Sequence, residues 1–150
     1  MKASGCPFCY NLEPQRASNH HAFSILDSRP VSPGHSLVIS RDHAPTVFDL
    51  PPVEYAACFE LVRELRELLV EKWKTKSLCV VMNCGAEANQ TIQHAHIHFV
   101  PSHRDVPLPP AANVWSSLNN LWHANGERNL QPFSSAGPIR GCGKPHAARA

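Results

Sequence analysis

The stretch Gln93-His94-Ala95-His96-Ile97-His98-Phe99-Val100-Pro101 alternates three histidines with apolar residues. Successive side chains of an extended chain point to opposite faces, so this period-2 pattern predicts a strand over residues 91–100. The three imidazoles would share one face, with neighbours about 6.6 Å apart. An unperturbed histidine is largely neutral near pH 7. One imidazole could therefore attack a substrate while its neighbours bind a metal ion or stabilise a charge.

A lone histidine on a strand is usually a packed or solvated residue, but three on one face of an apolar strand favour a functional site. Buried imidazoles need a hydrogen-bond partner for every ring nitrogen. One alternative makes His94, His96 and His98 joint ligands of a catalytic zinc or iron ion. That alternative would leave the cysteines near the start of the sequence without a purpose.

The length and composition indicate one ordinary globular domain. The chain has 150 residues, of which 43% are hydrophobic and 17% charged, enough for one sizeable core and too few for two. A net charge of +2 is too small to indicate a nucleic-acid or membrane partner. No apolar run approaches the roughly 20 residues of a membrane span.

The role expected for the cysteines depends on the compartment in which the protein works. Residues 1–6, Met-Lys-Ala-Ser-Gly-Cys, lack the apolar centre of a signal peptide. We therefore expect a cytoplasmic protein. In that reducing compartment the six cysteines are expected to be metal ligands or free thiols rather than disulfides.

Strand and helix patterns both occur, so the predicted fold class is α+β. The strands expected besides 91–100 cover residues 22–27, 35–40 and 78–83. Apolar residues recur at helical spacing between them, which predicts one long helix over 51–74. Pro51 and Pro52 suit its first turn, with Asp49 or a neighbour as the cap.

The C-terminal part of the sequence carries weaker signals. Residues 114–121 could form a short strand or helix, after a segment interrupted by prolines. Residues 123–150 are rich in Gly, Pro, Ser, Arg and Ala, which is typical of a loosely ordered tail. We therefore expect one domain over residues 1–122, followed by this tail.

Cys6-x-x-Cys9 has the spacing at which two thiolates can chelate one zinc ion. A closed tetrahedral site needs two further ligands. His43, just past the second expected strand, and His94 are the candidates. The alternative is that both cysteines are free thiols near the end of the chain.

Taken together, these motifs give the chain a resemblance to a known family. The matching segments are Cys-Pro-Phe-Cys at 6–9, Ala-Phe-Ser-Ile-Leu-Asp at 22–27, Pro-Val-Ser-Pro-Gly-His-Ser-Leu-Val-Ile at 30–39, Arg-Asp-His at 41–43, Asn83-x-Gly85, Gln90-Thr91 and the histidine stretch to Pro101. On these residues the chain resembles the histidine-triad (HIT) family of nucleotide hydrolases and transferases. The resemblance implies an antiparallel sheet of about five strands with one long helix packed on it, and a homodimer.

The resemblance also implies roles for individual residues. Zinc-containing relatives hold a structural zinc ion with the residues that match Cys6, Cys9, His43 and His94. The implied catalytic residues are His96, His98, Asn83 and Gln90, with His96 as the nucleophile that forms a covalent nucleotidyl intermediate. The implied nucleotide-binding residues are Phe8, Phe23, Ile25, Leu26, Asp27, Asn83, Asn89, Gln90, Thr91 and His98. Among these, Asp27 would bind the ribose hydroxyls and the apolar side chains would surround the base.

The implied function is hydrolysis of nucleoside 5′-phosphate derivatives at the α-phosphorus. The candidate substrates are small nucleotides, namely phosphoramidates, adenylates and dinucleoside polyphosphates. Many relatives carry two glycines and two arginines in the loop after the triad. The matching segment of this chain, residues 101–114, has no glycine, and its one arginine is Arg104. We therefore expect the smaller leaving groups to be preferred.

A second departure lies just before the triad, where the family's usual Ala-Gly-Gln-Thr reads Ala88-Asn89-Gln90-Thr91. Asparagine tolerates a left-handed conformation, so the turn can survive the replacement. The divergence at Asn89 and at Ser102 keeps an alternative open, a nucleotide-binding module with little turnover that acts through a partner protein.

Overall fold

The computed structural model describes residues 2–10, 15–74 and 76–104. The elements in chain order are strand β1 (Ala22–Leu26), strand β2 (Ser36–Ser40), 3-10 helix η1 (Val47–Asp49), helix α1 (Pro52–Trp73), strand β3 (Leu78–Val81), 3-10 helix η2 (Ala86–Ala88) and strand β4 (His96–Pro101). The element predicted at 114–121, the tail predicted at 123–150 and the domain boundary between them lie outside the described residues.

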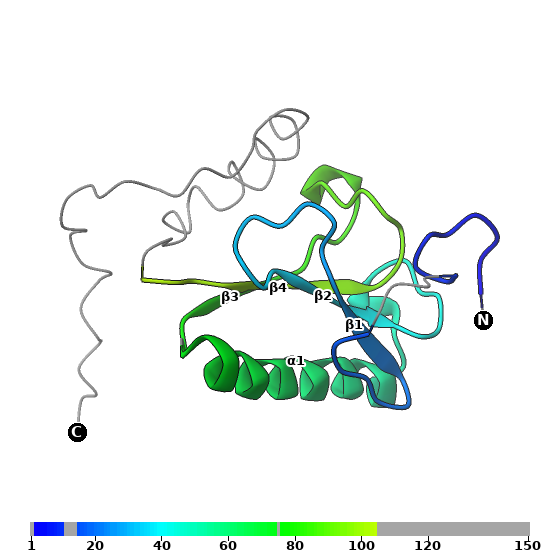
Figure 1. Ribbon diagram of the computed structural model, residues 1–150. Helices are drawn as coiled ribbons and strands as arrows, with labels where there is room; N and C mark the ends of the chain where they lie inside the picture. The colour runs from blue at the N-terminus through cyan, green and yellow to red at the C-terminus, as the bar shows by residue number, and fades with distance from the viewer. Residues whose placement is uncertain (1, 11–14, 75, 105–150) are drawn as a thin grey trace, which may run out of the picture.

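The strands form one antiparallel sheet in the order β1-β2-β4-β3, and α1 packs along one face of it (Figure 1). The α+β fold with one long helix on an antiparallel sheet is therefore confirmed. The expected number of about five strands is wrong for the described residues, in which the sheet has four.

A short extended segment beside β1 stands in place of a fifth strand. Arg16 donates its N–H to the carbonyl oxygen of Ser24 at 2.8 Å, and Ser24 donates its own N–H to Ala17 at 2.9 Å. The side-chain oxygen of Asn19 then accepts the N–H of Ala22 at 2.8 Å. This side-chain bond turns the chain after one isolated bridge, so the segment is too short to continue as a strand.

The histidine strand begins at His96, although the alternating pattern predicts a start at residue 91. The side-chain oxygen of Gln90 accepts the N–H of Gly85 at 2.8 Å, and its amide nitrogen donates to the carbonyl of Ile92 at 3.0 Å. The N–H of His94 donates to the same carbonyl at 2.8 Å. These bonds hold the chain in a turn through residues 91–94, and it becomes regularly extended only afterwards.

The alternation along β4 separates the core from the opposite face of the sheet. Ala95, Ile97 and Phe99 belong to the buried core on the α1 side, as the period-2 pattern predicts. Leu61 of α1 is fully buried in the same cluster. The two histidines of β4 therefore lie on the face that the helix leaves uncovered.

Helix α1 starts without a side-chain cap. Pro52 is its first residue, where the missing N–H of proline removes no helical bond, and Pro51 precedes it with no capping side chain. The sequence predicts Asp49 or a neighbour as the cap; the N-cap position is the neighbouring Pro51, and Asp49 does not cap this helix. Its carboxylate instead accepts the backbone N–H and the hydroxyl of Thr46 at 2.9 and 2.7 Å, which closes η1. The helix ends at Trp73, and its C-cap residue Lys74 takes the left-handed conformation with φ 55°.

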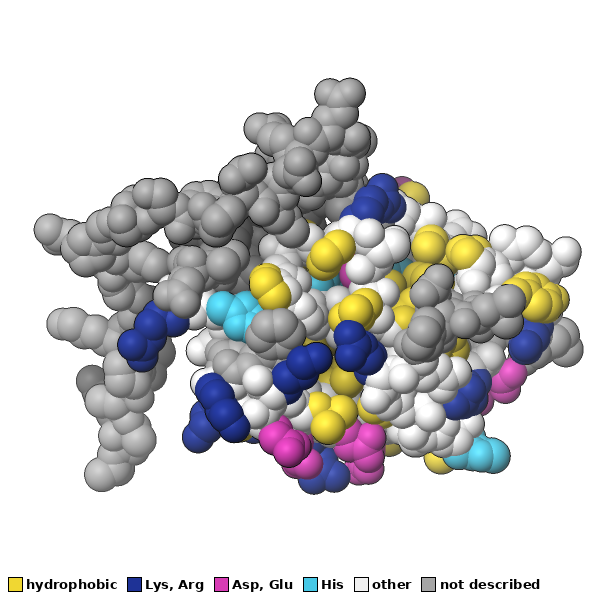
Figure 2. All heavy atoms as spheres, viewed as in Figure 1, with side chains coloured by type: hydrophobic (Ala, Val, Ile, Leu, Met, Phe, Trp, Pro, Cys, Tyr) yellow, Lys and Arg dark blue, Asp and Glu magenta, His cyan; other side chains and the backbone are white. Residues whose placement is uncertain are grey.

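The outer side of α1 is charged. Figure 2 shows acidic and basic side chains next to one another at the lower edge of the view, over the helix.

Within the described residues, no helix is both long enough and apolar enough to cross a bilayer.

Candidate functional site

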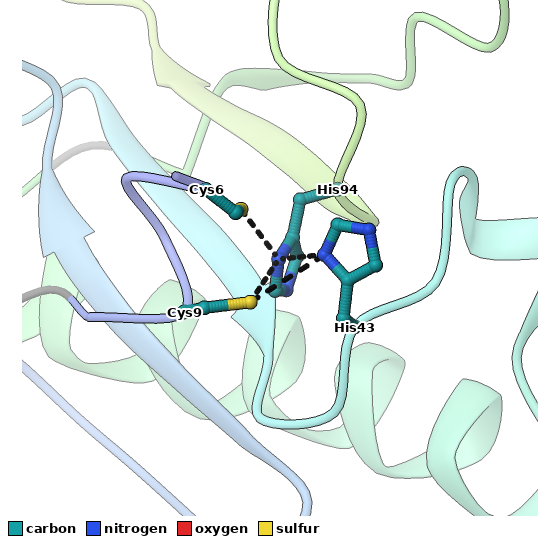
Figure 3. A group of neighbouring side chains, drawn as sticks. All are labelled: Cys6, Cys9, His43 and His94. Carbon is teal, nitrogen blue, oxygen red and sulfur yellow. Dashed lines mark hydrogen bonds between the residues drawn. The ribbon is translucent and has the colours of Figure 1, made fainter. Parts of the chain in front are cut away.

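Four side chains from three separate segments converge in one cluster (Figure 3). Cys6 and Cys9 come from the N-terminal loop, His43 follows β2, and His94 precedes β4. The Nδ1 atom of His94 lies 3.3 Å from the Cys6 sulfur, 3.6 Å from the Cys9 sulfur and 3.2 Å from Nδ1 of His43. The Cys9 sulfur lies 3.4 Å from Nδ1 of His43. The structure thus brings together all four residues predicted as metal ligands.

The donor set fits a tetrahedral metal ion. Zinc binds thiolate sulfur at about 2.3 Å and imidazole nitrogen at about 2.0 Å, which places neighbouring ligand atoms roughly 3.3–3.8 Å apart. The Nε2 atom of His94 lies 2.9 Å from the carbonyl oxygen of Ser40, to which it can only donate. The lone pair of a neutral His94 therefore lies on Nδ1, the atom that faces the cluster. These residues can hold a metal ion.

His94 turns toward the cysteines, whereas the next two histidines line a separate cavity. This orientation argues against the alternative in which His94, His96 and His98 bind one ion together. Among the described residues, the groups whose ligand atoms converge contain either His94 or His98, never both.

A cavity of about 400 Å³ lies on the sheet face opposite α1. Phe8 forms part of its wall, with a ring centroid 5.4 Å from that of His96 and 5.8 Å from that of His94. Phe8 stands between Cys6 and Cys9 in the sequence, so the cluster that anchors the N-terminal loop also places this ring. The residues lining the cavity are Pro7, Phe8, Ile25, Leu26, Asp27, Ser28, Arg29, Leu37, Thr91, Ile92, His96 and His98.

His96 is held with one ring nitrogen available. Its Nδ1 atom lies 2.6 Å from the carbonyl oxygen of His94, which can only accept, so Nδ1 carries the proton and Nε2 the lone pair. Burial lowers the pKa of His96, although the bond to His94 and the charge of Asp27 oppose the shift. A neutral ring with a lone pair directed away from the backbone can act as a nucleophile.

His98 belongs to a second group of titratable side chains. Its Nδ1 atom lies 3.1 Å from Nε2 of His35 and 3.8 Å from a carboxylate oxygen of Asp27. Burial, together with smaller effects of the charges of His96 and His35, lowers the pKa of His98 to about 3. His98 is therefore neutral at neutral pH.

His35 is the residue that sequence reasoning missed. It is completely buried, and burial lowers its pKa despite the nearby charge of Asp27. The available signal was a histidine at the start of a buried apolar strand, directly after Gly34. A polar side chain in such a place needs a buried partner, but the sequence does not show that the partner lies 63 positions away.

The predicted nucleotide-binding residues divide into two groups. Phe8, Ile25, Leu26, Asp27, Thr91 and His98 line the cavity together with His96. The others are Phe23, Asn83, Asn89 and Gln90, which do not line it. Phe23 packs behind the wall with Phe8 and Ile25.

Asn83 and Gln90 stabilise the loop that leads to the histidines. The Asn83 amide donates to the carbonyl of Ala88 at 2.5 Å. The Gln90 amide donates to the carbonyl of Pro45 at 2.6 Å. Asn89 stands where the family usually has glycine, and it takes the left-handed conformation, with φ 60° and ψ 33°. The loop therefore keeps its turn. The Asn83 amide binds the backbone of the loop itself, and the Gln90 amide ties the loop to the segment that follows β2.

Comparison with known proteins finds a matching family model and similar sequences. Residues 17–105 match the family model of the HIT domain. A 16.1 kDa HIT-like protein of Mycoplasma pneumoniae, described as uncharacterized, is 33% identical over 132 residues, covering 85% of this chain and 91% of that protein. The bis(5′-nucleosyl)-tetraphosphatase of Schizosaccharomyces pombe is 30% identical over 111 residues, covering 70% of this chain and 61% of that one. Adenylylsulfatase HINT3 of Arabidopsis thaliana is 40% identical over 77 residues, covering 51% of this chain and 39% of that one.

Solved structures show the same fold. A HIT family protein from Bacillus anthracis superposes with a TM-score of 0.65 at 24% identity, covering 85% of this chain and all of that one. A zinc-bound histidine triad family protein from Mycobacterium smegmatis superposes with a TM-score of 0.62 at 26% identity, covering 80% of this chain and 92% of that one.

Proposed function

The chain belongs to the HIT domain family, and from that premise we propose that it hydrolyses nucleoside 5′-phosphate derivatives at the α-phosphorus. The observation that carries this proposal is the His96 ring. It is neutral and buried at the wall of the cavity, and its Nδ1 proton is held by the carbonyl of His94. Its Nε2 lone pair is therefore the nucleophile.

The reaction proceeds in two displacements. Nε2 of His96 bonds to the α-phosphorus while the bond to the leaving group breaks, and the leaving group takes up a proton from solvent. The His96 ring then carries the nucleotidyl group and keeps its Nδ1 proton, whose bond to the His94 carbonyl stabilises the positive charge. Water attacks the phosphorus, the phosphorus–nitrogen bond breaks and returns its electron pair to Nε2, and the water proton passes to solvent.

The cavity favours a nucleotide with a small leaving group. Apolar side chains line one part of the cavity, and Asp27 supplies a carboxylate that can accept hydrogen bonds from the ribose hydroxyls. Arg29 is the one Lys or Arg side chain among the described lining residues, so a long polyphosphate would find little positive charge. The names of the relatives span both kinds of substrate, an adenylyl sulfate and a dinucleoside tetraphosphate. We propose that phosphoramidates and adenylates are preferred to dinucleoside polyphosphates.

A structural zinc ion belongs to the same proposal. Cys6, Cys9, His43 and His94 would hold it as a closed four-ligand site, and the zinc-bound relative supports the choice of metal. A closed site leaves no open position for substrate, so the ion would join the N-terminal loop to the segment before β4. Both thiols must be reduced to bind it, which fits the cytoplasmic location that we propose.

We propose that the protein is a homodimer. Among the residues that the structure describes, strand β3 forms one edge of the sheet, and its Val80 side chain is exposed. An uncovered edge with an apolar side chain can pair with a second copy. Light scattering should give twice the monomer mass for the parent and the monomer mass for Val80→Lys, whereas a monomeric parent would contradict the proposal.

The decisive experiment for the function measures AMP release from adenosine 5′-phosphoramidate by the purified protein and by His96→Asn. We expect release by the parent and a loss of at least a thousandfold in the variant, with AMP binding retained by both. The opposite result is tight AMP binding by both proteins with no release by either. That result would replace the hydrolase with a nucleotide-binding module that acts through a partner.

A further inference from the structure

We propose that His35 is a positioning residue that fixes the proton of His98 on Nε2, so that His98 donates a hydrogen bond to the α-phosphate. This inference rests on the proposed function for its substrate. Its structural part, the position of one proton, stands on contacts within the chain.

The protonation of His35 follows from its Nδ1 atom. The backbone N–H of Val31 donates to Nδ1 of His35 at 3.3 Å. An atom that accepts a hydrogen bond must carry a lone pair, so Nδ1 is unprotonated. The ring is fully buried and its pKa is lowered by burial, so it is neutral. The single proton of His35 therefore lies on Nε2.

The proton of His98 follows from the position of that N–H. Nε2 of His35 lies 3.1 Å from Nδ1 of His98 and 3.5 Å from a carboxylate oxygen of Asp27. Because Nε2 of His35 is a donor, Nδ1 of His98 must accept. With its low pKa, His98 holds only one proton near pH 7, and that proton lies on Nε2. The tautomer of His98 is thus set from outside the cavity.

The two histidines of β4 consequently have opposite tautomers. The ring centroids of His96 and His98 are 5.2 Å apart. His96 is protonated on Nδ1, because of the His94 carbonyl, and offers a lone pair. His98 is protonated on Nε2, because of His35, and offers an N–H. A cavity wall with a nucleophile beside a neutral donor suits attack on an anionic phosphate, since the donor stabilises charge that develops on a phosphate oxygen.

The same three side chains could instead be taken for a metal site, because Asp27, His35 and His98 present ligand atoms close together. The Val31 N–H argues against that assignment. An ion bound to Nε2 of a neutral His35 would require the ring proton on Nδ1, facing the N–H of Val31. Two donors would then face each other in a buried place without an acceptor.

The first test reads the proton directly. Protein containing ¹⁵N-histidine is examined by long-range ¹H–¹⁵N correlation at pH 7, and the His98 signals are assigned by their loss in His98→Asn. We expect the Nε2–H tautomer for His98 and the Nδ1–H tautomer for His96. A proton on Nδ1 of His98 overturns the proposal, and so does a second zinc equivalent that is lost in His98→Asn but retained in Cys6→Ser.

The second test compares two substitutions of His35. His35→Leu removes the donor, while His35→Gln can place an amide N–H near Nδ1 of His98. We expect His35→Leu to lower kcat roughly tenfold to a hundredfold with little change in KM, and His35→Gln to recover most of the loss. His20→Leu, the same change at an exposed histidine outside the cavity, controls for the substitution. Equal losses in the Leu and Gln variants would mean a packing role and would contradict the proposal.

The two tests separate this inference from the proposed function. If the parent does not release AMP, the tautomer measurement still decides where the His98 proton lies. If the parent turns over through His96 but His98 carries its proton on Nδ1, the function stands and the role of His35 fails. If His35→Leu does not fold, the tautomers of the parent remain the deciding observation.

Discussion

The backbone of His94 holds the ring of His96, since the His94 carbonyl oxygen lies 2.6 Å from Nδ1 of His96. The side chain of the same His94 faces Cys6 and Cys9. One residue therefore belongs to the four-residue cluster through its imidazole and orients the neighbouring histidine through its carbonyl. A disturbance of the cluster should reach the cavity by this route and through Phe8.

Loss of a cysteine from the cluster should lower both metal content and stability. We expect one zinc ion per chain in protein purified without a histidine tag, and loss of that ion in Cys6→Ser and Cys9→Ser. An ion that binds only the folded state stabilises it by about 2.7 kcal/mol at a hundred times its dissociation constant. Metal analysis with thermal unfolding measures both effects. Cys84→Ser, at a thiol outside the cluster, should change neither; equal zinc in all three variants would refute the ligand assignment.

Replacement of Phe8 should weaken substrate binding more than it slows turnover. The Phe8 ring lines the cavity and packs edge-to-face with the ring of His96, but it carries no group that takes part in the reaction. Loss of an aromatic contact with a base weakens binding by about 1–3 kcal/mol, so KM for Phe8→Ala should rise roughly fivefold to 150-fold. Steady-state kinetics should show kcat nearly unchanged. Tyr10→Ala, at a ring that is 57% exposed on the same loop, is the matched control. A fall in kcat at constant KM would place Phe8 in a different role.

Asp27 should distinguish ribose from deoxyribose. A carboxylate in the cavity wall can accept both ribose hydroxyls, and hydrogen bonds to a charged group contribute about 1.5–3 kcal/mol. We therefore expect Asp27→Asn to raise KM for an adenosine substrate about tenfold and to change KM for its 2′,3′-dideoxy analogue much less. The quantity to measure is the ratio of the KM increase for the adenosine substrate to the KM increase for the dideoxy analogue. This ratio is used because Asp27 also lies near His35, so the substitution can change kcat for both substrates. Equal increases in KM would remove the ribose from this assignment.

The sequence predicts the sheet face of each β4 residue because that property depends only on local alternation. Ile97 and Phe99 lie in the core and His96 lines the cavity, as period 2 requires. The start of the strand could not be predicted in the same way. It depends on where the side chain of Gln90 finds its partners, and one of these, the carbonyl of Pro45, is 45 positions away.

The sequence predicts those residues of the candidate site whose role follows from their side-chain type. It does not predict those whose role depends on a contact between distant parts of the chain. Cysteine and histidine are common metal ligands, so the cluster around His94 could be predicted from four residue types and a family resemblance. His35 is different, because its importance comes from Nε2 meeting His98 across the sheet. Asn83 is the opposite case, because it is predicted as a site residue and does not line the cavity. Its amide suits a phosphate, but in this structure it binds the carbonyl of Ala88.

The core beneath the site should be sensitive to cavities at the centre of α1. Leu61 is fully buried among the side chains of the helix face of the sheet, whereas Leu68 on the same helix is 48% exposed. Truncation of a buried leucine lowers the free energy of unfolding by about 2–5 kcal/mol. We expect a loss of that size for Leu61→Ala and less than about 1 kcal/mol for Leu68→Ala, measured by urea unfolding. Similar losses at both positions would contradict the packing described for α1.

Stability should fall as the pH is lowered below about 6.5, and His98 should contribute to the fall. In the unfolded chain a histidine takes up a proton near pH 6.5, whereas burial in the folded state lowers the pKa of His98 to about 3. Between these values the unfolded chain binds a proton that the folded chain does not. Each such histidine therefore lowers the free energy of unfolding by about 1.4 kcal/mol for each pH unit below 6.5, and the effect ceases below pH 3.

The measurement is urea unfolding of the parent and of His98→Asn between pH 7.5 and 4.5. The slope of stability against pH should be smaller in the variant by about one proton over the lower part of this range, because asparagine does not titrate. Both proteins keep the four-residue cluster, so any loss of metal at low pH affects them alike and cancels in the difference. His20→Asn, at an exposed histidine, should keep the parent's slope. Identical slopes for His98→Asn and the parent would mean that His98 takes up its proton in the folded protein as readily as in the unfolded chain, and would contradict its burial as a neutral ring.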